Sequence, residues 1–137
     1  MNVNEAIILL KYHALREEQP ASSTCEAFLH YFRTSHSVEK ASVHEIMSSL
    51  NVVAESWGNQ TEINREVISC LIDITFISQE RLNDSYLNHH SCSKKDYDKY
   101  SLWIECISRA VMCILSGMTF HEASLEYREL FLDENRG

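Results

Sequence analysis

The densest group of metal-binding and nucleophilic side chains in the sequence is His89, His90 and Cys92. Histidine nitrogen and cysteine sulfur are both good zinc ligands, and a cysteine beside a histidine can be activated as a thiolate nucleophile. A structural zinc site needs four ligands in recognisable pairs, however, and no spacing indicates where a fourth would come from. We therefore expect a polar loop between two helices here, and we predict no metal and no cofactor.

The glycines give no support to an enzyme site elsewhere. Thiolate catalysis needs a neighbouring base and usually an oxyanion pocket, often at a glycine-rich turn or a helix N-terminus. Gly58, Gly117 and Gly137 stand beside no cysteine or histidine pair, and the motifs GxSxG, GxxxxGK and HExxH do not occur. The sequence therefore predicts a protein that is not an enzyme. A Cys and His enzyme site remains an alternative.

Four acidic residues near the C-terminus form the most suggestive pattern. Glu122, Glu126, Glu129 and Asp133 follow one another at spacings of four, three and four, which places them on one ridge of a helix with only Arg128 nearby. Like charges at this spacing destabilise a helix by about 0.2–0.5 kcal/mol per pair. The ridge is either a surface for a basic partner or the solvated face of an acidic protein. We take the four acids as candidate partner-binding residues.

The overall charge narrows the class of partner. Twenty Asp and Glu stand against 12 Lys and Arg, for a formal net charge of -8. Such an excess favours basic surfaces and opposes contact with phosphate backbones. The segment 117–127 looks like the opening of a helix-turn-helix, but no second helix follows it. We expect another protein with a basic surface as the partner, and no direct nucleic-acid binding.

Cysteine usage and hydropathy indicate a location. The five cysteines are odd in number, widely spaced and without a CxxC pair, which is typical of small buried hydrophobes in a reducing compartment. No run approaches the roughly 18 apolar residues that a membrane-spanning helix needs. The N-terminal residues lack the basic start and cleavage site of a secretory signal. The sequence therefore predicts a cytoplasmic protein that makes no membrane contact.

The elements that must position these side chains are all expected to be helices. Apolar residues recur with the helical period, and only three glycines and one proline interrupt 137 residues. The β-branched run 72–77 has strand propensity, but its flanks keep the helical period and a single strand would have no partner. We predict an all-α fold: one domain, residues 1–137, forming a single compact irregular or orthogonal bundle of about six helices.

Capping signals and turn residues set the expected boundaries. Capping boxes are predicted at Ser42–Glu45 and Thr119–Glu122, with a weaker one at Ser93–Asp96. The fifth helix is expected to be largely buried, because nearly every position between Leu102 and Met118 is apolar. The predicted helices span residues 4–18, 22–34, 42–57, 61–87, 93–117 and 119–134.

Two functional hypotheses follow. In the first, the protein is a small inhibitor, of the immunity, antitoxin or phage-blocker type, whose acidic surface covers the cationic cleft of a nucleic-acid-acting partner. Aromatic side chains that could anchor this contact are Trp57, Tyr97, Tyr100 and Tyr127. In the second, it is a structural or assembly subunit, a homodimer or an effector chaperone, that uses the apolar stripe from Val43 to Trp57 as an interface.

Overall fold

The computed structural model describes residues 1–34, 37–58 and 64–132, and over these residues it contains helices and no strands, which confirms the all-α prediction. Two segments are π-helices: η1 (Asp73–Ile77) and η2 (Arg128–Leu132). The elements in chain order are α1 (Val3–His13), α2 (Phe28–Thr34), α3 (Lys40–Trp57), α4 (Arg65–Ile72), η1 (Asp73–Ile77), α5 (Ser78–Leu87), α6 (Lys94–Leu115), α7 (Phe120–Ala123), α8 (Leu125–Tyr127) and η2 (Arg128–Leu132).

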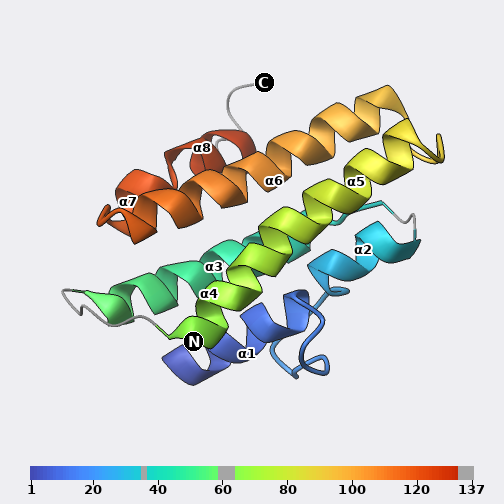
Figure 1. Ribbon diagram of the computed structural model, residues 1–137. Coiled ribbons are helices and arrows are strands. Elements are labelled where there is room, and N and C mark those ends of the chain that lie inside the picture. The colour runs from blue at the N-terminus through green and yellow to red at the C-terminus, as the bar shows by residue number, and fades with distance from the viewer. Residues whose placement is uncertain (35–36, 59–63, 133–137) are drawn as a thin grey trace.

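The bundle is organised around two long helical rods (Figure 1). One rod is α4, η1 and α5 joined end to end, and the other is α6, which returns antiparallel to it. The α7–α8 segment packs on α6, while α1 packs mainly on α3. In Figure 1, α6 lies between α7–α8 and the first rod, and α1 and α2 lie on the far side of that rod.

The apolar stripe of α3 is core. Val43, Ile46, Met47 and Leu50 are fully buried, and Trp57 at the end of the helix is 9% exposed. Helix α3 contacts α1, α6 and α7. The stripe is therefore not available as the interface that the second hypothesis assigned to it.

The rod that contains η1 confirms helix, rather than strand, for the β-branched run 72–77, but the turns there are wider than an α-helix. Its serine and threonine hydroxyls bond back to the chain: Thr75 Oγ1 donates to the carbonyl of Leu71 at 2.9 Å, and Ser78 Oγ to that of Ile74 at 2.5 Å. Such bonds satisfy carbonyls where the regular ladder is interrupted. The rod begins with Asn64 as its cap, whereas the predicted start, Thr61, lies outside the described residues.

Helix α6 buries one face only, which corrects the expectation of a largely buried fifth helix. Ser93 caps it as predicted, its hydroxyl accepting the N–H of Asp96 at 3.1 Å. Leu102, Met112 and Leu115 are exposed to solvent on the other face. None of the helices in the described ranges has the length and apolarity needed to cross a membrane.

The capping box predicted at Ser42–Glu45 is wrong. Helix α3 begins at Lys40, and the Ser42 hydroxyl donates to the carbonyl of Glu39 at 2.7 Å, while the Glu45 carboxylate is used elsewhere. The Thr119–Glu122 box is confirmed.

Three helix lengths also differ from the prediction. The helix that follows Thr119 is interrupted at Ser124, which separates α7 from α8. Helix α1 ends at His13 because Leu15 adopts a left-handed conformation, with φ 61°. Helix α2 starts only at Phe28, because the residues before it join a polar network described below.

Candidate functional site

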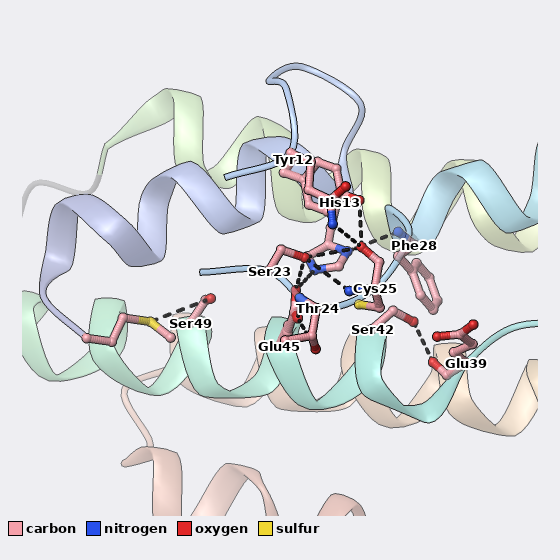
Figure 2. A network of polar contacts seen from close by, with 12 residues as sticks. Tyr12, His13, Ser23, Thr24, Cys25, Phe28, Glu39, Ser42, Glu45 and Ser49 are labelled. Carbon is pink, nitrogen blue, oxygen red and sulfur yellow. Dashed lines mark hydrogen bonds and ion pairs between the residues drawn. The ribbon is translucent and has the colours of Figure 1, made fainter. Parts of the chain in front are cut away.

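One group of potential metal ligands converges in the described part of the chain, and the sequence did not single it out. His13 lies at the end of α1, Cys25 in the loop before α2, and Glu45 on α3, and their donor atoms all lie within 4.8 Å of one another. His13 is fully buried, Cys25 is buried and the Glu45 side chain is 14% exposed. Figure 2 shows the three side chains facing one another across the α1–α3 contact.

The hydrogen bonds of His13 fix the position of its ring proton. The backbone N–H of Phe28 donates to Nδ1 at 3.0 Å, so Nδ1 carries a lone pair and no proton. The proton therefore lies on Nε2, which donates to Glu45 Oε1 at 3.0 Å. A metal ion bound at Nε2 would require the proton on Nδ1, directly opposite the N–H of Phe28. The donor set does not fit a metal ion.

The same geometry bears on nucleophilic catalysis. In a thiol triad the histidine lies between the cysteine and the carboxylate, with one ring nitrogen for each. Here Phe28 occupies one nitrogen of His13 and Glu45 the other, so none is left for Cys25. Burial, and then the Glu45 carboxylate, raises the pKa of the Cys25 thiol to about 12. Cys25 is a buried thiol and not an activated thiolate.

The network instead anchors the loop between α1 and α2. Besides His13, the Glu45 carboxylate accepts the Ser23 hydroxyl at 2.7 Å and the backbone N–H of Thr24 at 2.8 Å. Burial alone would raise the pKa of Glu45, but these hydrogen bonds outweigh it and lower the pKa to about 2. On the other side, the Tyr12 hydroxyl donates to the carbonyl of Cys25 at 2.6 Å. The loop is thereby held to α1 through Tyr12 and to α3 through Glu45 (Figure 2).

His89, His90 and Cys92 lie in a loop between two helices, α5 and α6, as expected. His89 Nε2 is 3.1 Å from Asp84 Oδ2, and His90 has a left-handed backbone, with φ 52°. Cys92 is half-buried, and burial, followed by the charge of Asp96, raises the pKa of its thiol. These side chains are not among the converging ligand groups of the described residues.

The four candidate acids have different surroundings. Glu122 Oε1 accepts the Thr119 hydroxyl at 2.9 Å in the capping box, and Glu126 Oε2 lies 3.5 Å from Arg109 Nη1. Glu129 is exposed, and Asp133 lies outside the described residues. Because the helix is interrupted at Ser124, the acids do not follow one regular helix. Their role in binding stays a prediction.

Two arginine side chains, Arg109 and Arg128, lie near these acids, but only Arg109 forms ion pairs with them in the described residues. Arg109 also contacts Glu105 on its own helix, Nη2 to Oε1 at 2.8 Å, so it links an acid of α6 to Glu126 of α8. Arg128, the cation that the sequence places beside the acids, donates to the carbonyl of His121 at 2.5 Å. We call these acids of the described chain, together with Glu105 of α6, the acidic region. Its residues are Glu105, Glu122, Glu126 and Glu129.

An open groove of about 580 Å³ lies on the other side of α6, between it and the η1–α5 part of the first rod. We call it the α5–α6 groove. Of the aromatic residues proposed as anchors, Tyr97 lines this groove, whereas Trp57, Tyr100 and Tyr127 are buried. The residues that line the groove include Phe76, Gln79, Tyr97, Ser101, Ile104 and Glu105.

Comparison of the chain with protein-family models, with curated proteins and with solved structures finds no match.

Proposed function

We propose that this protein is a small acidic protein-binding module that neutralises a basic, nucleic-acid-acting partner, in the manner of an inhibitor or an immunity or antitoxin protein. The observation that carries the proposal is the group of acidic side chains on α6, α7, α8 and η2. Glu105 and Glu126 share the single guanidinium of Arg109, while Glu122 and Glu129 are exposed on α7 and η2, the segments before and after α8. This region belongs to a chain of net charge -8.

Charge of this kind has a direct effect on association. A surface with a strong negative potential attracts a cationic protein over several ångströms and orients it, so encounters are faster and wrong partners are rejected. A nucleic-acid-acting protein carries such a cationic surface for its own substrate. The acidic region would cover that surface.

The buried network supports a binding role over a catalytic one. His13 and Glu45 are engaged by internal hydrogen bonds, and Cys25 is held as a thiol. All five cysteines are free, which supports a cytoplasmic location as part of the same proposal.

The proposal is tested by matched charge reversals. Glu129→Lys changes an exposed acid of the acidic region, and Glu17→Lys changes an exposed acid after α1, with the same effect on net charge. Each variant and the native protein serve as bait in a lysate of the source cells, at several salt concentrations, with quantitative mass spectrometry. We expect capture of a basic protein to fall about tenfold for Glu129→Lys, to change little for Glu17→Lys, and to weaken with salt.

Equal capture by all three baits, with no dependence on salt, would contradict the proposal. Glu126 is left unchanged in this test because reversing it would also place a lysine against Arg109.

The alternative, a structural or assembly subunit, loses its original surface because the α3 stripe is core. A different observation favours a docking role: large apolar side chains are exposed beside the α5–α6 groove. Phe76 is 65% exposed and Ile72, one turn earlier, is 55% exposed. A homodimer through this surface would bring together two chains that each carry a net charge of -8, and these chains repel each other.

A further inference from the structure

The π-helical segment η1 presents an unusual side chain to solvent. Phe76 lies within this five-residue segment and is 65% exposed, although burying a phenylalanine contributes about 1.5–3 kcal/mol. π-helical turns are rare and occur frequently at functional sites, because they widen the helix and redirect its side chains. The position of Phe76 in such a turn, at the edge of a groove, indicates a contact surface.

Both walls of the α5–α6 groove carry exposed apolar side chains. On the first rod, Ile72 and Phe76 are one turn apart and therefore share a face. On α6, Met112 is 65% exposed and lies one turn beyond Ser108, which also lines the groove. Ile104 of α6 also lines the groove, but it is only 2% exposed and belongs to the core beneath these side chains. The two rods run side by side in Figure 1, so the groove has the direction of a helix.

Of the residues that line the groove, Glu105 alone is charged, and the acid Glu80 lies just outside it. Glu80 follows Phe76 by one turn, is exposed and has no ion pair with another described residue. Glu105 lines the opposite wall and shares Arg109 with Glu126. A second copy of this chain would add negative charge to this surface, so the complementary occupant is a cationic one.

We propose that the α5–α6 groove binds an amphipathic, basic helix of the partner protein. Its apolar side chains, at positions i, i+3, i+4 and i+7, pack against Phe76 and Met112, and its lysines or arginines face Glu80 and Glu105. This inference rests on the proposed function, since it names the part of a basic partner that is recognised.

The test uses the full chain and a synthetic helical peptide of about 15 residues made of leucine and lysine, with leucines at i, i+3, i+4 and i+7. A peptide with glutamate in place of lysine is the charge control. Two protein variants are matched: Phe76→Ser in the groove, and Leu87→Ser at the end of α5, where the leucine is 63% exposed. Binding is measured by fluorescence anisotropy at low and high salt.

We expect the lysine peptide to bind the native protein, and Phe76→Ser to weaken binding about tenfold while Leu87→Ser changes it less than about twofold. Both residues are exposed, so neither variant removes core packing. The glutamate peptide is expected to show no binding, since its charge has the same sign as that of the protein.

The outcomes separate this inference from the proposed function. If Phe76→Ser binds the lysine peptide as the native protein does, or if neither peptide binds the native protein, the groove is not the docking site. A salt-dependent preference for the lysine peptide without any effect of Phe76→Ser overturns the groove and leaves the acidic region as the binding surface. Equal binding of both peptides, lost in Phe76→Ser, overturns the basic partner and the charged part of this inference.

Discussion

At the scale of single residues, the main finding is how Glu45 is used. A buried carboxylate is unfavourable unless hydrogen bonds replace its hydration. Here His13, Ser23 and the backbone of Thr24 donate to it, so one side chain of α3 joins α1 to the loop that precedes α2. The group resembles a reactive site by composition, but its proton positions make it a structural one.

Glu45→Gln is expected to destabilise the fold by about 2–3 kcal/mol at pH 7, because it removes a charge that three donors stabilise and turns an amide N–H toward some of them. The free energy of unfolding is measured by urea denaturation. Glu55→Gln is the control, since Glu55 lies exposed on the same helix and should change the stability by less than about 0.5 kcal/mol. Equal stability of the two variants would contradict the structural role.

The pKa of Glu45 gives this prediction a pH dependence. The pKa is 4.5 in the unfolded chain and about 2 in the fold, so the unfolded state binds the proton more readily. The contribution of Glu45, about 3 kcal/mol, is complete above pH 4.5 and is lost as the pH falls toward 2. The difference in stability between the native protein and Glu45→Gln should therefore shrink over that range.

At the scale of elements, the C-terminal segments pack on α6 and are also held by a contact with α3. Helices α7 and α8 have four and three residues, too few to be stable by themselves. His44 of α3 contacts Tyr127, Nδ1 to hydroxyl at 2.5 Å, and its ring lies 5.7 Å from that of Phe131. Together with Trp103 of α6, whose ring lies 5.2 Å from that of Phe131, this contact helps to hold α8 and η2, and with them the acidic residues of the proposed binding surface.

We predict that docking of α8 and η2 weakens as the pH falls below about 6.5. Burial, and to a smaller extent Lys40, lowers the pKa of His44, so the protonated ring is disfavoured in the fold and favoured when the segment is released. Amide protection factors for residues 125–132 should decrease between pH 7.5 and about 5.5. In His44→Gln, which does not titrate, the decrease should be absent. The same decrease in both proteins would assign it to another group.

At the scale of the whole molecule, charge dominates. A net charge of -8 repels a second copy of the chain, and the described residues bury the stripe that could have served as a dimer interface. The exposed apolar surface at the α5–α6 groove is therefore better suited to a cationic partner than to self-association.

We expect the protein to sediment as a monomer of 15.9 kDa at micromolar concentration and at low ionic strength. Added salt screens the repulsion, so any self-association should appear first at high salt. Sedimentation velocity at low and high salt checks this. A tight dimer at low salt would favour the assembly-subunit hypothesis over the inhibitor.

The sequence by itself determined the helical class, the apolar stripe of α3 and the helix starts at Ser93 and Thr119, whereas the structure decided that the stripe is core. These features depend on residues three or four positions apart, whose interactions any helix containing them will make. It also indicated that the run 72–77 is helical, although not that its turns are π-helical.

Only the tertiary structure decided the contacts of Glu45 and the exposure of Phe76. Ser42 and Glu45 have the spacing of a capping box. However, His13 and Thr24, which are distant in the chain, offer the Glu45 carboxylate better-placed donors. The sequence pattern within α3 contains no information about these distant donors. The α5–α6 groove likewise exists because two rods pack side by side, and the interruption at Ser124 divides a helix that looked continuous. Long-range packing selects among local alternatives of nearly equal free energy, and it made that selection at Glu45 and at Ser124.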